Sequence, residues 1–149
     1  MLFAVGAPQV DRYLPGPSLA ASLQLSLTKW IMPVLRVRGG LLSAGSGQPD
    51  LATLGSVVAG LRFRPRGIAH PEEVPRATCI WAEVDAGVGL WNGLVRPAFE
   101  AAIGFTFEAG DVGLGPVVRF LHVLPADASD GPDPFLMTLG LEVLFGDAR

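Results

Sequence analysis

The side chains that could perform acid–base chemistry are few. Glu83 and Asp85 are two carboxylates separated by one residue, and a pair of carboxylates can serve as acid and base in glycoside hydrolysis. Both are expected on a face that also carries several arginines. Because a nearby arginine favours the ionised form of a carboxyl group, we expect the pair to be structural. The sequence therefore predicts no catalytic residue.

Metal-binding and cofactor-binding patterns are also weak. His70 and His122 lie far apart and Cys79 is the sole cysteine, so no cluster has the spacing of zinc ligands. A calcium loop of the EF-hand type needs ligands at alternate positions and a closing glutamate. The chain has instead three aspartates spaced by three residues, Asp127, Asp130 and Asp133. We expect an acidic, solvated loop there, and neither a metal nor a cofactor.

Length and composition limit the kind of protein that could hold these residues. The 149 residues suit one domain, residues 1–149, and a net charge of −3 gives no reason to expect nucleic acid as a partner. Charged residues make up 17% of the chain, whereas soluble domains carry roughly 25%. The basic residues are arginines apart from Lys29. Arginine is preferred where a charge is paired away from bulk water, so the chain has little of an ordinary soluble surface.

Export and membrane signals of the helical kind are missing. No apolar run reaches the length of a transmembrane helix. The segment 1–7 lacks a basic region and is too short for a signal peptide. We therefore expect either a mature form or a fragment, or a chain that is not exported.

A period of two residues dominates the sequence. Apolar residues alternate with polar or small ones, which is the pattern of half-buried β-strands. The alternating segments are 18–28, 35–41, 53–64, 80–90, 94–108, 112–124 and 135–145, with a weaker one at 2–8. Asn92-Gly93 between two of them is typical of a type I′ hairpin. No segment has the pattern of an amphipathic helix, so we predict an all-β protein with eight antiparallel strands.

An eight-stranded antiparallel sheet is expected to close into an up-and-down barrel, because closure removes its edges. The polar face of the strands is rich in Gly, Ala, Ser and Thr and carries charges of both signs. A narrow lumen needs small residues to make room for a few long ones, and charges held there must pair. The predicted inward charges are Arg36, Arg38, Arg62, Arg64, Arg96 and Arg119 with Glu83, Asp85, Glu100, Glu108 and Glu142.

The opposite face carries no charge in the clear segments, and His122 is its only strongly polar side chain. An arginine or lysine facing lipid at the bilayer midplane costs about 2–4 kcal/mol, so a bilayer would impose such a face. We therefore predict a transmembrane β-barrel. Pro97 and Pro116 share this face and are expected near strand ends or bulges. The alternative is a soluble lipocalin-like barrel or sandwich, a binding protein that buries this face as its core.

Features at the strand ends leave two questions open. Four aromatic residues fall at or near strand ends, where they suit either a membrane interface or the caps of a soluble core: Tyr13, Trp30, Trp81 and Trp91. If both chain ends are periplasmic, the connection 65–78 is an unusually long inner turn and Asn92-Gly93 an unusually short outer loop.

The last segment, Thr138-Leu-Gly140-Leu-Glu-Val143-Leu-Phe145, has a polar residue, a glycine, an apolar residue and an aromatic residue at regular spacing. It resembles the C-terminal β-signal by which bacterial outer-membrane barrels are recognised by their assembly machinery. It differs in that 146–149 follow the aromatic residue. The resemblance implies that the barrel-assembly machinery is a partner through Thr138–Phe145.

Residues 16–146 more broadly resemble the N-terminal barrel domain of myxobacterial OmpA-like proteins. The resemblance is carried by 81–90, 93–100 and 114–122. It implies a barrel in the outer membrane. A peptidoglycan-binding domain often follows that barrel, and these 149 residues do not contain one, so no tethering to the cell wall is predicted.

One further resemblance concerns an enzyme. Arg119-Phe-Leu-His122 is similar to the Arg-aromatic-x-His segment of outer-membrane lipid A deacylases, in which a serine and an asparagine follow. Leu124 and Pro125 stand at these two positions, so the histidine lacks its nucleophile. We expect His122 to be an interfacial residue near a strand end. A lipid A-modifying barrel enzyme is the third alternative.

These observations together predict a non-enzymatic barrel in the bacterial outer membrane that acts as an anchor or structural protein. Its lumen is expected to be plugged by arginine–carboxylate pairs. The expected partners are outer-membrane lipid, the assembly machinery and, through the loops, other envelope proteins. Three aromatic side chains should then face outward, namely Phe99, Phe105 and Phe107, while Arg62 and Glu100 face inward.

Overall fold

The computed structural model describes residues 1–5, 13–28, 30–45, 51–64, 78–109, 112–125 and 135–145. The regular structure in these ranges is β-strand, which confirms the all-β prediction. The strands are β1 (Leu2–Ala4), β2 (Tyr13–Leu14), β3 (Ser18–Gln24), β4 (Ile31–Ala44), β5 (Ala52–Phe63), β6 (Thr78–Trp91), β7 (Leu94–Ala109), β8 (Val112–Val123) and β9 (Phe135–Phe145). Within these ranges no helix is long and apolar enough to cross a membrane.

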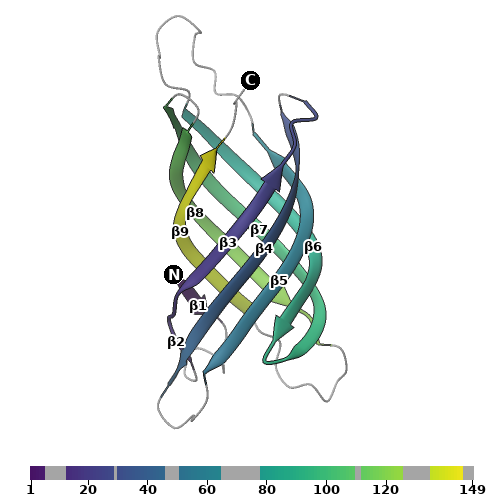
Figure 1. The fold of residues 1–149 in the computed structure, drawn as a ribbon, viewed down its shortest axis with the longest axis vertical. Helices are drawn as coiled ribbons and strands as arrows, with labels where there is room; N and C mark the ends of the chain where they lie inside the picture. Colours follow the sequence, from purple (N-terminus) through teal and green to yellow (C-terminus); the bar gives the residue numbers. More distant parts are fainter. Residues whose placement is uncertain are drawn as a thin grey trace, which may run out of the picture.

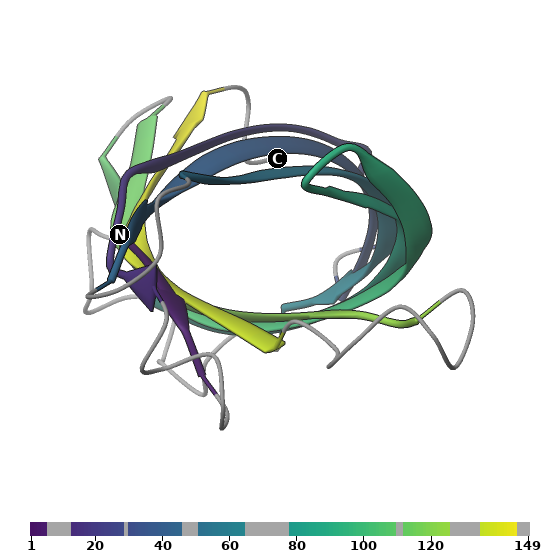
Figure 2. The ribbon, with the colours of Figure 1, turned by 90° about the horizontal axis from the view of Figure 1, so that it is seen from below.

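The strands form one antiparallel sheet that curls into a nearly closed barrel (Figures 1 and 2). From β4 to β9, each strand pairs with the strand before it in the chain, as in an up-and-down barrel. The two-residue strand β2 also pairs with β4. Near one rim β1 joins the two ends of the sheet, because it pairs with β9 while Leu2 exchanges two backbone hydrogen bonds with Gly16. With β1 and β3–β9 counted, the prediction of eight strands is confirmed.

The turn between β6 and β7 has the predicted hairpin geometry. Asn92 and Gly93 both have a positive φ, 48° and 86°. A type I′ turn requires positive φ at both central residues, and asparagine and glycine tolerate it best. Trp91 and Leu94 pair directly across the turn, so the turn fixes the register of the β6–β7 ladder.

Several strand boundaries differ from the sequence prediction, among them the two that flank the connection between β3 and β4. β3 ends at Gln24 instead of continuing to Thr28, and β4 begins at Ile31. The hydroxyl oxygen of Thr28 accepts hydrogen bonds from the backbone N–H groups of Trp30 and Ile31. Threonine side chains compete in this way with the strand ladder and stabilise a turn. Alternation alone does not reveal such a local hydrogen bond.

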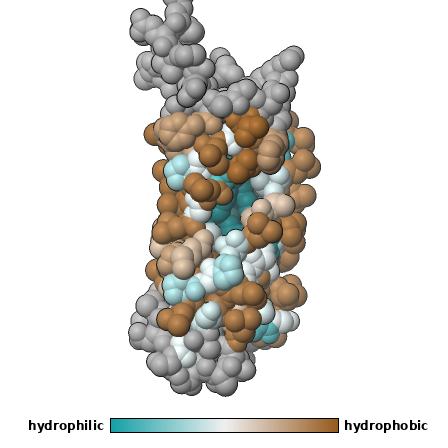
Figure 3. All heavy atoms as spheres, turned by 60° about the vertical axis from the view of Figure 1, so that its left-hand side comes forward, coloured by the Kyte–Doolittle hydropathy of each residue, from teal (hydrophilic) through white to brown (hydrophobic). Residues whose placement is uncertain are grey.

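Side chains along each strand alternate between the inside and the outside of the barrel. In β5 and β8 the buried positions recur at every second residue. Phe99 and Phe107 point outward and are 53% and 54% exposed, whereas Arg62 and Glu100 are 1% and 3% exposed. The outside therefore presents mainly hydrophobic side chains (Figure 3). The predicted orientation is observed, because in these strands the charged face points inward and the apolar face points outward.

One end of the lumen is apolar. Where β1 meets β9, the inward side chains pack into a buried hydrophobic cluster, and Tyr13 lies edge-on to Trp91 with 5.9 Å between ring centroids. The cluster consists of Leu2, Leu42, Ala52, Leu54, Trp91, Ala98, Leu121, Val123 and Leu136. Burial of this apolar surface stabilises the rim and fills it. Leu121 and Leu136 share the alternating face of the inward charges in their strands, but the sequence analysis did not predict the cluster.

The two prolines of the outer face have different surroundings. Pro97 lies close to the start of β7, as expected. Pro116 lies inside β8, and the β7–β8 ladder is interrupted beside it between the pairs Gly104–Val117 and Phe107–Leu114. The interruption follows from the missing N–H of proline. The register is the same on both sides of the interruption, so the bulge expected at Pro116 is absent.

Some predicted loops lie outside the described residues. These are the acidic loop with Asp127, Asp130 and Asp133, and the connection 65–78 apart from Thr78, which belongs to β6. The expectations for these loops stay predictions.

Candidate functional site: the charged lumen

Charged side chains from six neighbouring strands converge in the lumen. Because the side-chain period of a strand is two, a charge at every second position is brought to the same interior. The strand register then sets opposite charges beside each other, as for Arg62 and Glu83, which are direct cross-strand partners. The groups are Arg36 and Arg38 from β4, Arg62 from β5, Glu83 and Asp85 from β6, Glu100 from β7, Arg119 from β8 and Glu142 from β9. All are buried except Glu142, which is half-buried.

Glu83 is the centre of this network. Its Oε1 accepts hydrogen bonds from Arg36 Nη1 and from Arg119 Nη1, the latter at 2.7 Å. Its Oε2 accepts a hydrogen bond from Arg62 Nε, also at 2.7 Å. One fully buried carboxylate thus compensates part of the positive charge of three guanidinium groups, which belong to three different strands. Such charge-assisted bonds are roughly twice as strong as neutral ones.

Glu100 and Glu142 extend the network to two further strands, β7 and β9. Glu100 Oε1 accepts hydrogen bonds from Arg36 Nη1, Arg38 Nη2 and Arg119 Nη1 at 3.0, 2.9 and 3.0 Å. Glu142 accepts two from Arg62, at 2.9 and 2.8 Å, and one from Arg119 Nη2 at 3.0 Å. Arg36, Arg62 and Arg119 each bind carboxylates from at least two strands, and Arg38 shares Glu100 with Arg36. The network therefore connects the strands across the lumen.

Trp81 has an inward position that the sequence analysis did not predict. It was expected near a strand end, either at a membrane interface or as a cap of a soluble core, but it lies in the lumen and is 1% exposed. The guanidinium carbon of Arg62 lies 3.7 Å from the ring centroid of Trp81, a cation–π contact. The indole N–H donates a hydrogen bond to Thr106 Oγ1 at 3.0 Å. The signal for this position was in the sequence, because Trp81 shares the alternating face of Glu83 and Asp85.

Gly104 makes room for the Trp81 ring. A Cβ atom added at Gly104 would lie 2.1 Å from Trp81 Cζ2, which no structure tolerates without a shift. We predict that Gly104→Ala lowers the free energy of unfolding by about 1–3 kcal/mol through overpacking. Urea titration of the protein in detergent micelles measures this change. Gly39→Ala is the matched control, since a Cβ there meets nothing within 4 Å, and equal stability losses in the two variants would contradict the prediction.

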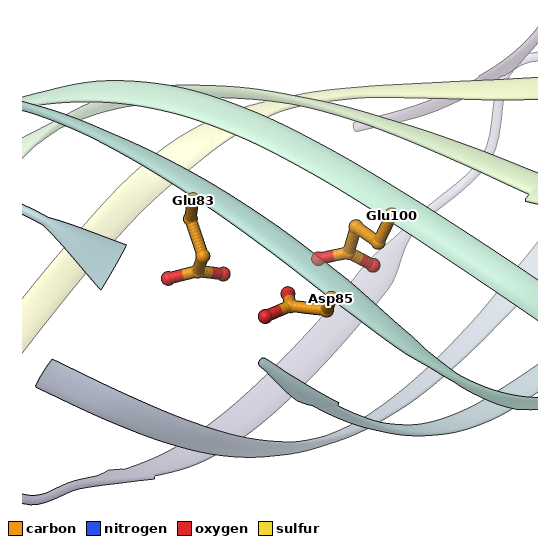
Figure 4. A group of neighbouring side chains, drawn as sticks. All are labelled: Glu83, Asp85 and Glu100. Carbon is orange, nitrogen blue, oxygen red and sulfur yellow. The ribbon is translucent and has the colours of Figure 1, made fainter. Parts of the chain in front are cut away.

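Three of the carboxylates lie close enough to suggest a cation site. The potential ligand atoms of Glu83, Asp85 and Glu100 all lie within 4.8 Å of one another (Figure 4). Arginine nitrogens already occupy this space, because Arg36 Nη1 contacts all three carboxylates. A metal ion would have to displace that guanidinium and leave it buried without its partners, which is strongly unfavourable. The cluster is therefore read as part of the ion-pair network.

The remaining predicted inward charges have mixed outcomes. Arg96 is buried in β7, as expected. Arg64 lies just beyond the end of β5 and is half-exposed. The side chain of Glu108 lies outside the described part of the structure, so its predicted position is untested.

The histidine of the deacylase-like segment lies on the outer face, as predicted. His122 is half-exposed and packs edge-on against Phe135 with ring centroids 5.8 Å apart. Leu124 and Pro125 follow β8 at the positions where the deacylases carry serine and asparagine. Neither residue can act as a nucleophile, so the segment lacks the pair that acyl transfer needs.

Comparison with known proteins adds no family. No protein-family model, no curated protein and no solved structure matches the chain. The functional interpretation therefore depends on the barrel and on the distribution of side chains over its two faces.

Proposed function

We propose that this chain is a β-barrel of a bacterial outer membrane that acts as an anchor or structural protein and catalyses no reaction. The single observation that carries the proposal is the sorting of side chains across the wall. The charged side chains that the structure describes within the strands point into the lumen, and the described outward positions are apolar apart from a few small or polar ones and His122. A soluble barrel gains nothing from such an exterior, whereas a bilayer requires it.

Strand length supports the same proposal. A strand that crosses a bilayer at a tilt of about 45° needs about 9–11 residues. β5 has 12 residues, β6 has 14 and β7 has 16, so these strands are long enough to cross with some residues to spare.

The filled lumen supports a structural role and argues against a channel. The arginine–carboxylate network occupies the middle of the lumen, and the hydrophobic cluster around Leu2, Trp91 and Leu121 occupies one end. Small barrels are generally filled by side chains in this way, while water-filled channels need more strands.

Assembly by the outer-membrane machinery is part of the proposal. The segment Thr138–Phe145 forms the larger part of β9, and its alternate residues Leu141 and Phe145 point outward and are 74% and 83% exposed. The resemblance to the β-signal and this exposed, aromatic-ended last strand support recognition of β9 by that machinery.

Cell fractionation tests the proposed location. The protein is expected in the outer-membrane fraction, soluble only in detergent, and the folded barrel should migrate differently from the heat-unfolded chain on a gel. Recovery from the aqueous fraction without detergent would refute the location. As a control for the enzymatic alternative, the mass of lipid A should be the same with and without expression of the chain.

Conductance measurements test the closed lumen. We expect planar bilayers that contain the purified barrel to show no conductance of porin size, because side chains fill the lumen. Large, stable single-channel steps would contradict this expectation.

A further inference from the structure

Among the described residues, the wall of the barrel has a gap between β3 and β9. Within the described residues, β3 pairs with β4 and with no strand on its other side, and β9 pairs with β8 and with the short β1. β1 covers only Leu136–Thr138 of β9. Beyond Met1, the edge of β9 from Gly140 to Phe145 and the edge of β3 lie unpaired on the two sides of the gap. Figure 3, which brings forward the side where β3 and β9 lie in Figure 1, shows a hydrophilic hollow between two hydrophobic flanks.

Side-chain exposure marks the extent of the gap. In β9, Leu136 and Thr138 point inward beside β1 and are buried, but Gly140 two residues further is exposed. In β3, Ala20 and Ser22 point inward and are also exposed, so both faces of this strand meet solvent. The other strands show the alternation of a closed wall. In the part of the chain that the structure describes, the wall is therefore open from Met1 to the rim at which β3 and β9 end.

An unpaired sheet edge is costly in lipid, where no water can satisfy its N–H and C=O groups, and in water it invites aggregation. The unpaired backbone edges of β3 and β9 therefore call for another strand.

The register of β1 shows what fits the gap. β1 pairs antiparallel with β9, Leu2 opposite Thr138, and Leu2 also lies opposite Gly16 at the start of the β3 edge. Continuing both ladders past Met1 gives one consistent alternation. The residue joined to Met1 would face Gly140 and Ser18 on the inside. The next residue would face Leu141 and Leu19 on the outside, and so on to Gln24.

We propose that the gap is the site of one further antiparallel β-strand that continues β1 from the amino group of Met1. The strand is as long as β3, 7 residues, with apolar side chains outward and small or polar side chains inward. It replaces the exposed edges with two complete ladders. It also gives eight full-length strands. An even number of antiparallel strands places the first and last ends of the barrel-forming chain at the same rim, as in bacterial outer-membrane barrels.

Continuity with the β1–β9 ladder favours this occupant over a strand from another molecule. The amino nitrogen of Met1 already donates a hydrogen bond to the carbonyl oxygen of Leu139, and the N–H of Leu139 donates to Met1 O at 2.9 Å. The amino nitrogen thus occupies the position of a ladder amide. A separate strand would have to end there, with its carboxylate beside the charged amino group inside the wall. A peptide bond at this nitrogen avoids both charges.

Disulfide trapping tests the gap in the chain as it is. In a Cys79→Ala background, Leu19→Cys and Leu141→Cys are expected not to form a disulfide, because two strands on either side of an empty position lie about 9–10 Å apart. A disulfide needs Cα atoms within about 7 Å. Efficient formation of this disulfide would show that β3 and β9 pair directly, and it would overturn the proposal.

The same method tests the occupant. The segment Thr-Val-Ser-Leu-Ser-Val-Ala is joined to Met1, its last valine is replaced by cysteine, and it is paired with Leu141→Cys. We expect this disulfide to form in preference to one with Val143→Cys, which is two residues out of register. The matched control is Val-Thr-Leu-Ser-Val-Ala-Ser, which has the same composition and the opposite alternation, with its alanine next to the last residue replaced by cysteine. Equal trapping by both segments would overturn the proposal.

A free peptide distinguishes the source of the strand. When the alternating segment is added as a separate peptide at about 10 µM, trapping should fall far below that of the joined segment, whose effective concentration is on the order of millimolar. Equal trapping would assign the gap to a partner chain and refute the continuation of β1. Because all these measurements are made in detergent micelles, they depend on the fold and not on the proposed location in a membrane.

Discussion

Val84→Arg is expected to lower the free energy of unfolding of the barrel in lipid vesicles by about 2–4 kcal/mol. Val84 lies midway along β6 between Glu83 and Asp85, and its side chain points outward with 57% of its surface exposed. If lipid surrounds this face, the arginine must leave water at the depth where a charge costs most. Reversible urea unfolding in vesicles measures the change.

Val95→Arg is the matched control for depth. Val95 is the second residue of β7, next to the hairpin turn, and it points outward with 67% exposure. A charge near the interface costs about 0–1 kcal/mol, so the two variants should differ clearly. If the face meets water, both substitutions should change stability by about 0.5 kcal/mol or less, as surface substitutions do. That result would refute the membrane-facing exterior.

Glu83→Gln is expected to lower the free energy of unfolding by about 3–5 kcal/mol, the range measured when one partner of a buried ion pair is removed. Glu83 accepts hydrogen bonds from Arg36, Arg62 and Arg119. The substitution keeps the size of the side chain but removes its charge, and it turns an NH₂ group toward guanidinium donors. Three buried arginines then lose part of their compensation together.

Glu142→Gln is the matched control for this network. Glu142 also binds Arg62 and Arg119, but its side chain is 13% exposed, while that of Glu83 is fully buried. Water can replace part of what is lost at Glu142, so we expect a clearly smaller loss of stability. Similar small losses in both variants would show that the lumen is solvated and that the network does not hold the wall.

Much of the fold could be predicted because a strand has a side-chain period of two. Every second residue of 94–108 is apolar, and this alone separates Phe99, facing outward, from Glu100, facing inward. The hairpin at Asn92-Gly93 was equally predictable, since few other residues accept positive φ at two successive positions. The end of β3 was not, because the hydrogen bonds of Thr28 to nearby backbone N–H groups depend on the local turn and not on alternation.

The residues of the candidate site could be predicted from the sequence, but the contacts between them could not. Alternation placed Arg62, Glu83 and Glu142 on one face, but it could not show that Arg62 bridges the two carboxylates while its guanidinium lies over Trp81. Those contacts depend on strand register and on the closure of the barrel, which bring β5 and β9 across the lumen. The space that Gly104 leaves for the Trp81 ring depends on the same closure.

The sequence by itself determined that the chain forms β-strands with one uncharged face and one face of small residues and balanced charges. This was possible because alternate residues of a strand point to opposite faces, so each face can be identified without knowing the partner strand. The tertiary structure alone decided which carboxylate each arginine reaches, where the lumen is apolar, and that β3 and β9 leave a gap between them in the described wall. These features depend on pairing between residues far apart in the chain, and a local sequence pattern does not show which strand edges pair.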